Sequence, residues 1–287
     1  PAGPMAREAR PRLFTQVMPR FGGKFSFVDA TRIEEVDKAC EAETRMLWIE
    51  SPTNPLLRLV DIAARGEIAR RRGLQLVVDN TFATPFLQNP LALGASITLH
   101  STTKYIGGHS DVIGGAVVVD DEETAKRLQF TRNATGGVPG PWDAWLTLRG
   151  AKTLALRMRE HERNAAAIAQ FLTTRREIAK VYYPGLPDHP GHQLARRQMR
   201  GFGGMLAVEM RGGAAAAKKL CESTRLFAPG ESLGGVESLI GYPFTMSHGA
   251  FPPEEKRRKG LGEAVVRISA GIEHADDLCA DLAQALD

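Results

Sequence analysis

The fold is decided by the segment from Leu74 to Lys104, which reads LQLVVDNTFATPFLQNPLALGASITLHSTTK. It contains two short apolar runs, at 74–79 and 97–100, and polar residues stand at the end of each run. Near-continuous apolar runs of this length are typical of strands that are buried on both faces of a sheet. The segment therefore predicts two consecutive strands of an α/β sheet, each with polar side chains at its carboxyl end.

The sequence around this segment continues the alternation of strands and helices. Further apolar runs at 46–49 and 115–119 predict two more strands. Residues 61–72 have a helical pattern, with Asp61 as a candidate N-cap and Gly73 as its stop. The first half of the chain is therefore predicted to form an α/β sheet with both faces covered.

A long helical pattern from Pro141 to about Leu172 separates this half from the rest of the chain, and helices of that length often join two domains. Beyond it, apolar runs at 205–210 and 265–269 predict further strands. Helices are expected to begin near Ala214 and Asp276. We predict a large domain over 1–145, and a linking helix with a smaller domain over 146–287.

Composition and charge argue against several classes of protein. The 287 residues, 43% of them hydrophobic, suffice for a large and a small globular domain. The basic excess is only 37 − 33 = 4, and no aromatic residues are interleaved with the arginine pairs, so nucleic-acid binding is not predicted. The chain has no apolar run of about 18 residues, and its cysteines form no CxxC pair. We expect a cytoplasmic protein without membrane spans or disulfides.

Two side chains in the deciding segment point to chemistry. Burying Asp79 is costly unless the carboxylate meets a cation, such as a protonated pyridine nitrogen; a turn or N-cap aspartate is the alternative. Lys104 can form an imine with an aldehyde once desolvation lowers its pKa, although most lysines at strand ends are surface residues. The hydroxyls of Ser101 and Thr103 are spaced to accept a phosphate.

A third candidate is Arg267, which lies inside the apolar run at 265–269. Its planar guanidinium suits a carboxylate ligand, and an internal salt bridge is the alternative. His189 and His192 have a spacing that metals can use, but they stand in a turn rich in Pro and Gly. We therefore predict an anion site at Arg267 and no metal site.

These residues belong to blocks that resemble the Cys/Met-metabolism family of pyridoxal-phosphate enzymes, which includes cystathionine γ-lyases, γ-synthases and β-lyases and methionine γ-lyases. The resemblance runs from about Arg12 to Asp287. The matching blocks are ESPTNP at 50–55, VDNTFATP at 78–85, STTKYIGGHSD at 101–111, ESLGGVESL at 231–239 and VRISAGIE at 266–273. The resemblance implies the aspartate-aminotransferase-like fold of type I pyridoxal-phosphate transferases, with a truncated large domain and a small C-terminal α/β domain.

The resemblance also implies a role for each matching residue. Lys104 would bond to the cofactor pyridoxal 5'-phosphate and carry protons between substrate carbons. Arg267 would bind the α-carboxylate of the substrate, helped by the backbone around Ser232. The other implied cofactor contacts are Asp79 on the pyridine nitrogen, Asn54 near the ring hydroxyl and the substrate, Thr81 beside the ring, and Ser101 and Thr103 on the phosphate.

The block at 231–235 resembles the γ-lyases and γ-synthases more than the other members. Its Glu231, at the mouth of the site, suits a substrate with a second amino group, although a surface glutamate in a loop is the alternative. The implied reaction is γ-elimination on cystathionine to cysteine, 2-oxobutanoate and ammonia; γ-replacement on an activated homoserine ester is the alternative. The family also implies a homo-oligomer, built as a dimer of dimers.

The resemblance has one departure, at the amino end. Members of the family carry further residues there, including an arm and a Gly-rich loop that both contact the cofactor phosphate. They also carry a Tyr that stacks on the cofactor, where this chain has Arg7-Glu-Ala-Arg10. Loss of such contacts is expected to weaken cofactor binding by several kcal/mol, at about 1–2 kcal/mol each. A shortened, catalytically impaired relative that binds full-length subunits is therefore the second hypothesis.

Overall fold

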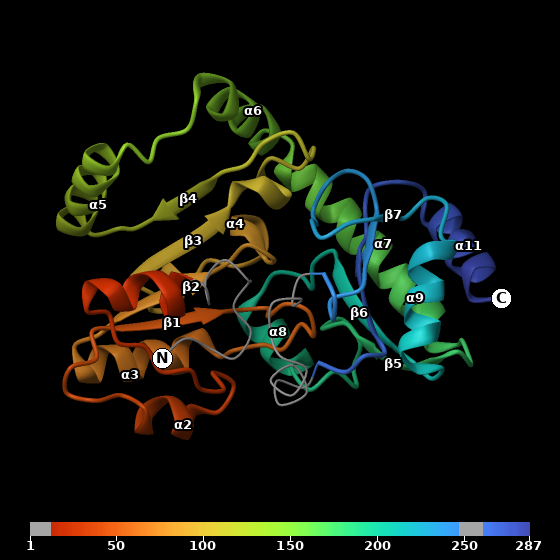
Figure 1. The fold of residues 1–287 in the computed structure, drawn as a ribbon, viewed down its shortest axis with the longest axis horizontal. Helices are drawn as coiled ribbons and strands as arrows, with labels where there is room; N and C mark the ends of the chain where they lie inside the picture. Colours follow the sequence, from red (N-terminus) through yellow and green to blue (C-terminus); the bar gives the residue numbers. More distant parts are fainter. Residues whose placement is uncertain (1–12, 247–260) are drawn as a thin grey trace.

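The computed structural model describes residues 13–246 and 261–287, so the segment Arg7–Arg10 lies outside the described ranges. Two sheets organise the chain, one of four strands in the order β1-β2-β3-β4 and one of five strands in the order β5-β6-β9-β8-β7 (Figure 1). This mixed α/β arrangement agrees with the predicted fold class. The division into domains at 145/146 stays a prediction.

The first sheet contains the deciding segment. Its strands are β1 (Met46–Glu50), β2 (Gln75–Asp79), β3 (Ile97–Ser101) and β4 (Gly115–Val118). The first three are parallel, with Glu50 opposite Asp79 and Asp79 opposite Leu99, so their carboxyl ends meet at one edge. The predicted helix is α3 (Ile62–Arg72), whose first turn is capped because Asp61 accepts a hydrogen bond from the Ala64 N–H.

Several shorter helices precede or connect these strands. They are η1 (Leu13–Val17), η2 (Met18–Phe21), α2 (Ile33–Lys38), α4 (Thr84–Leu87), η3 (Leu91–Leu93) and η4 (Thr102–Ile106). A buried amide network holds the turn after β2, because Asn80 donates to the carbonyls of Thr84 and Gln88 while the Gln88 amide donates back to Asn80. The carboxyl end of β2 is thereby fixed by side chains as well as by the sheet.

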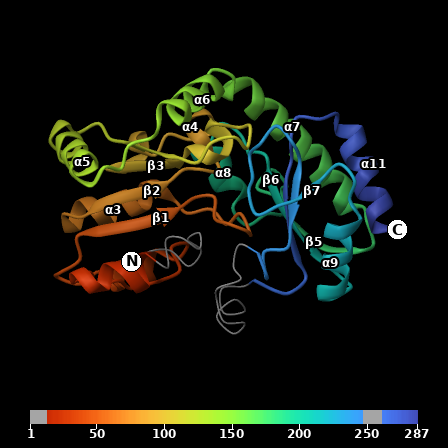
Figure 2. The ribbon, with the colours of Figure 1, turned by 45° about the horizontal axis from the view of Figure 1, so that its top comes forward.

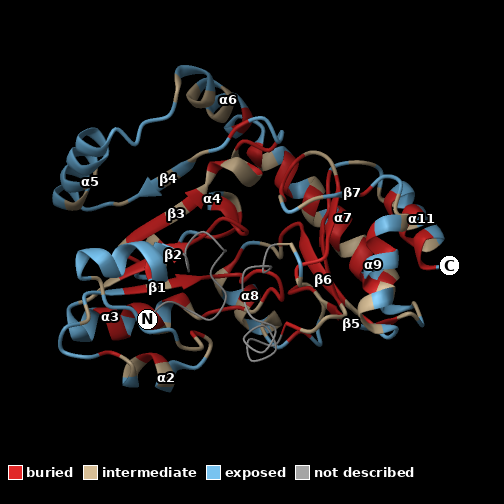
Figure 3. Cartoon of the chain, in the orientation of Figure 1, coloured by how far each residue is buried: buried red, intermediate tan, exposed pale blue. Residues whose placement is uncertain are grey.

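The outer edge of this sheet differs from the prediction of strands buried on both faces. β4 runs antiparallel to β3, and most of its residues are exposed. The next helix, α5 (Glu122–Thr135), has no buried residue, and Figure 3 shows most of this region in the exposed colour. Trp142 and Trp145 are 74% and 51% exposed. An apolar run alone did not reveal that β4 is an edge strand.

The long helix predicted from Pro141 to about Leu172 is wrong in one respect, since the structure has two helices, α6 (Pro141–Ala151) and α7 (Leu154–Thr173). Thr153 leaves the helical conformation between them, at φ −105° and ψ 4°. The end of α6 packs closely on another segment, because a Cβ at Gly150 would lie 2.1 Å from the Gly107 carbonyl oxygen. This tertiary contact accompanies the break.

The second sheet holds the largest hydrophobic core. Its strands are β5 (Ile178–Tyr182), β6 (Met205–Met210), β7 (Ala228–Pro229), β8 (Leu239–Gly241) and β9 (Val265–Ser269). The accompanying helices are α8 (His192–Gln198), α9 (Gly213–Ser223) and α11 (Ala275–Leu286). α7 and α9 pack beside the strands and α11 packs against these two helices (Figure 2). The buried apolar side chains of all three helices form one cluster with those of β6 and β9.

A buried histidine ties α7 to this sheet and makes stability sensitive to acid. His161 is fully buried, and its Nδ1 lies 2.7 Å from the Ala270 carbonyl oxygen. Burial lowers the pKa of His161 from its ordinary 6.5 to about 4. Between these two values the unfolded chain binds more protons than the folded chain, so stability falls as the pH drops.

We therefore expect the free energy of unfolding to fall by about 1 kcal/mol per pH unit between pH 6 and pH 4.5 from this group, the range following from the lowered pKa. Urea unfolding at several pH values measures the slope. A His161→Gln variant removes the titrating group and should give a shallower slope. Equal slopes for the two proteins would contradict the assignment.

Candidate active site

Lys104 follows β3 in the short turn η4, and its amine contacts the second half of the chain. Lys104 Nζ donates to Ser232 Oγ at 2.6 Å across 128 positions of sequence. The backbone of Lys104, at φ −98° and ψ −135°, departs from the helical values around it. The lysine is half-buried.

Arg267 lies in the middle of β9 and is 4% exposed. Its Nη2 donates to the carbonyl oxygens of Glu231 and Ser232, both at 2.8 Å, and its Nη1 donates to Asn54 Oδ1 at 3.2 Å. Ser232 thus contacts both the predicted lysine and the predicted arginine. The structure therefore brings together Lys104, Ser232, Glu231, Arg267 and Asn54 in one connected set of hydrogen bonds.

A second set of contacts joins the carboxyl ends of β2 and β3. Asp79, 6% exposed, accepts a hydrogen bond on Oδ1 from the Thr81 N–H at 2.8 Å. Thr81 Oγ1 in turn accepts from the Ser101 N–H at 2.9 Å. This contact agrees with the alternative of a turn aspartate. Asp79, Thr81 and Ser101 therefore lie at the sheet edge from which the Lys104 turn begins.

Two predicted residues make contacts that sequence reasoning did not anticipate. The Thr103 hydroxyl accepts from the Gly114 N–H at 3.0 Å and donates to the Gly114 carbonyl at 3.3 Å, so it closes the loop after β3. Glu231 is exposed, and its backbone carbonyl rather than its carboxylate contacts Arg267. A phosphate contact for Thr103 and a substrate contact for Glu231 stay predictions.

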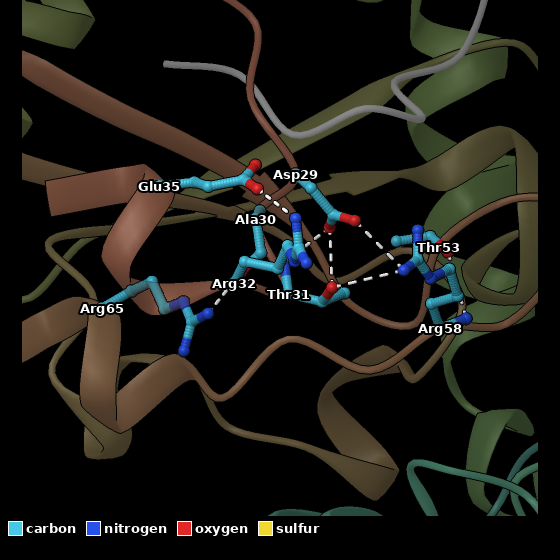
Figure 4. Close-up of polar contacts among 8 residues, drawn as sticks. All are labelled: Asp29, Ala30, Thr31, Arg32, Glu35, Thr53, Arg58 and Arg65. Carbon is cyan, nitrogen blue, oxygen red and sulfur yellow. Dashed lines mark hydrogen bonds and ion pairs between the residues drawn. The ribbon is translucent and has the colours of Figure 1, made fainter. Parts of the chain in front are cut away.

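Charged residues that sequence reasoning missed support the loop carrying Asn54 (Figure 4). Asn54 is 2% exposed, and the neighbouring Thr53 exchanges backbone and hydroxyl hydrogen bonds with Arg58 at 3.0 and 3.1 Å. The Arg58 guanidinium pairs with the Asp29 carboxylate at 3.1 Å. Asp29 also accepts from Thr31. The sequence gives no periodic signal for the pair of Asp29 and Arg58, because the two residues are 29 positions apart and lie outside helices and strands.

Gly234 gives the Ser232 loop its close approach to Lys104. Its φ is +74°, and a Cβ there would lie 2.7 Å from the backbone nitrogen of Tyr105. We expect Gly234→Ala to lower the free energy of unfolding by about 1–3 kcal/mol, because both strain and a backbone clash oppose the side chain. Urea denaturation measures the loss. Gly262→Ala, with nothing near its Cβ, is the matched control, and equal stability of the two variants would refute the argument.

In the described ranges, no group of three or more His, Cys, Asp and Glu side chains has an arrangement that could hold a metal ion. Within the same part of the chain, no helix combines the length and the apolar character needed to cross a membrane.

Comparison with known proteins places this chain in a family. A family model described as Cys/Met metabolism PLP-dependent enzyme matches residues 8–287. The cystathionine gamma-synthase of Mycobacterium tuberculosis is 51% identical over 275 residues, which cover 96% of this chain and 70% of that protein. The cystathionine gamma-lyase of Dictyostelium discoideum is 48% identical over 276 residues, covering 96% and 71%. The solved structure of cystathionine gamma-lyase from Lactobacillus plantarum, complexed with L-serine, is 41% identical with a TM-score of 0.96, covering 99% of this chain and 74% of that chain.

Proposed function

The chain belongs to the Cys/Met metabolism PLP-dependent enzymes, and from this premise we propose that it cleaves L-cystathionine by γ-elimination. The observation that carries the proposal is the contact of Ser232 with two groups at once. Its hydroxyl accepts from the Lys104 amine, while its carbonyl accepts from the Arg267 guanidinium. A base and an anion-binding group held on one residue suit a reaction at the α carbon of an amino acid.

The residues at the ends of β2 and β3 fit pyridoxal phosphate. The buried Asp79 carboxylate suits a protonated ring nitrogen, and the half-buried Lys104 amine suits the aldehyde. Ser101 and Thr103 would face the phosphate, and Thr81 and Asn54 would face the ring. When bound, the cofactor supplies a sink for the electrons that the substrate's α carbon releases.

The chain's own residues would then bind the substrate and move its protons. Arg267 binds the α-carboxylate, and its orientation is fixed by Asn54 and by the carbonyls of Glu231 and Ser232. Lys104, whose amine is aimed by Ser232 Oγ, removes the proton from the α carbon and returns protons to the carbon chain. With water, the products are cysteine, 2-oxobutanoate and ammonia.

The second candidate is γ-replacement, in which cysteine is joined to an activated homoserine ester. It is favoured by sequence identity, because the chain is 51% identical to a cystathionine gamma-synthase and 48% identical to a cystathionine gamma-lyase. Glu231 at the mouth supports either reaction, because cystathionine with its second amino group is the substrate of one and the product of the other.

Product analysis separates the two reactions. The protein is incubated with pyridoxal phosphate and L-cystathionine, and separately with L-cysteine and a homoserine ester. We expect 2-oxobutanoate to be released from cystathionine. If cystathionine forms from the ester mixture and no 2-oxobutanoate is released from cystathionine, γ-replacement is favoured. If the cofactor binds and neither product forms, both reactions are refuted.

We also propose that the protein is a cytoplasmic homo-oligomer. The exposed apolar side chains around β4 and α6, among them Val117, Trp142 and Leu148, support a subunit interface. The cysteines Cys40, Cys221 and Cys279 are free, as a reducing compartment would keep them. Sedimentation equilibrium tests the assembly, and a monomer at micromolar concentration would contradict it.

A further inference from the structure

Arg157 places a buried positive charge directly under the Lys104 turn. It lies on α7 and is 4% exposed. Its guanidinium donates to the carbonyls of Tyr105 at 2.6 Å, Ile106 at 3.2 Å and Gly150 at 2.8 Å, and to Thr153 Oγ1 at 3.0 Å. Burial lowers the pKa of Arg157. Burying a charge is costly unless its donors are satisfied, so these hydrogen bonds are needed to keep the guanidinium in place.

The backbone around Arg157 is shaped to receive it. Gly108 has a φ of +74°, and a Cβ at this position would lie 2.1 Å from Arg157 Nη1. Gly150 lies against the carbonyl of Gly107 and also accepts from Arg157. Only glycine at 108 and 150 leaves room for the guanidinium and for the close approach of α6 to the turn. The surroundings of the Arg157 guanidinium are therefore formed by the turn after Lys104 and by the end of α6 together.

The groups that Arg157 holds determine the backbone of Lys104. Tyr105 and Ile106 follow the lysine directly, and the Gly108 N–H donates back to the Lys104 carbonyl at 2.8 Å. Gly108 also accepts from the Val236 N–H at 2.9 Å, which ties the turn to the loop carrying Ser232. Displacing residues 105–108 would therefore move both the lysine and the serine that contacts its amine.

We infer that Arg157 is a positioning residue for Lys104, which holds the 105–108 backbone with a planar, multiply bonded guanidinium so that the lysine amine is aimed at the cofactor aldehyde. The inference rests on the proposed function for the identity of the aldehyde. It rests on geometry rather than on charge alone, because a lysine at 157 would keep the charge but lose the fork that spans several carbonyls.

The test compares Arg157→Lys and Arg157→Met with Arg163→Lys, an exposed arginine on the same helix that pairs with Glu160. Two properties are measured well below the unfolding temperature. The first is the rate constant at which a visible absorbance band forms with saturating pyridoxal phosphate. The second is hydrogen exchange at the Gly107 and Gly108 amides in the cofactor-free protein, which donate to Thr102 and Lys104.

We expect both Arg157 variants to form the band on the order of 10²-fold more slowly, as a misplacement of about 1 Å can cause, and to exchange these amides faster. Arg163→Lys should match the wild type in both measurements. A wild-type rate and wild-type exchange in Arg157→Lys would overturn the inference.

Other outcomes remain decisive. If the wild type forms no band, the proposed function fails, while amide exchange at residues 107 and 108 still decides whether Arg157 holds the turn. If both Arg157 variants fail to fold, Arg157 is a folding residue and the assignment is overturned. Gly108→Ala, which displaces the guanidinium without deleting it, should also slow band formation; a wild-type rate in this variant would count against the inference.

Discussion

A Lys104→Ala variant is expected to form no visible absorbance band with pyridoxal phosphate and to lose turnover by about 10⁴-fold. The variant removes the amine that bonds to the aldehyde and, in the proposed reaction, the base that moves the substrate's protons. Absorbance spectra and the initial rate of 2-oxobutanoate release measure the two losses.

Lys104→Arg and Lys152→Ala serve as controls for this result. Lys104→Arg keeps a positive charge near Ser232 but cannot bond to the aldehyde, so it should be as inactive as the alanine variant. Lys152, which is exposed at the end of α6, should be replaceable without loss. A Lys104→Ala variant that retained the band would show that another amine reacts, and the assignment would be wrong.

Asp79→Asn is expected to give the second largest effect, a loss of kcat/KM of about 10²-fold together with weaker cofactor binding. Its carboxylate, buried at the end of β2, is proposed to keep the pyridine nitrogen protonated. A neutral amide does so poorly, and the electron sink is weakened. Asparagine still offers an oxygen to the Thr81 N–H, so the turn at 79–81 should be kept.

The matched control for this variant is Asp121→Asn, because Asp121 also accepts a backbone hydrogen bond, from Thr124, but lies at the exposed start of α5. Steady-state kinetics and cofactor titration compare the two. Wild-type kcat/KM in Asp79→Asn would contradict the proposed pairing. If Asp79→Asn lowers only the thermal stability, Asp79 acts as a turn aspartate, which was the alternative interpretation.

Local sequence patterns predicted the elements that are determined by neighbouring residues, namely buried strands and capped helix ends. The buried strands of the first sheet give continuous apolar runs, and α3 carries both of its end signals in Asp61 and Gly73. Because parallel strands place their carboxyl ends at one edge, the strands before Asn80 and before Thr102 end on the same side of the sheet. Only the family resemblance predicted that residues of the second half, such as Ser232, belong to the same site as Lys104, because no local pattern relates the two halves of the chain.

The features that were missed depend on contacts between distant segments. The break between α6 and α7 accompanies the packing of Gly150 on Gly107, and the partners Arg157 and Tyr105 are 52 positions apart. The exposure of β4 follows from its place at the edge of the sheet, which the run of apolar residues at 115–119 does not encode. Arg157 in particular looks like one more arginine of a basic helix until its partners are known.

The most direct test of the role of Lys104 is to trap the cofactor covalently on the lysine that bonds to it. The protein is incubated with pyridoxal phosphate, reduced with sodium borohydride and digested, and the modified peptide is identified by mass spectrometry. We expect one pyridoxyl group per chain, on Lys104 and on no other lysine. Modification of a different lysine, or scattered labelling with Lys104 unmodified, would contradict it.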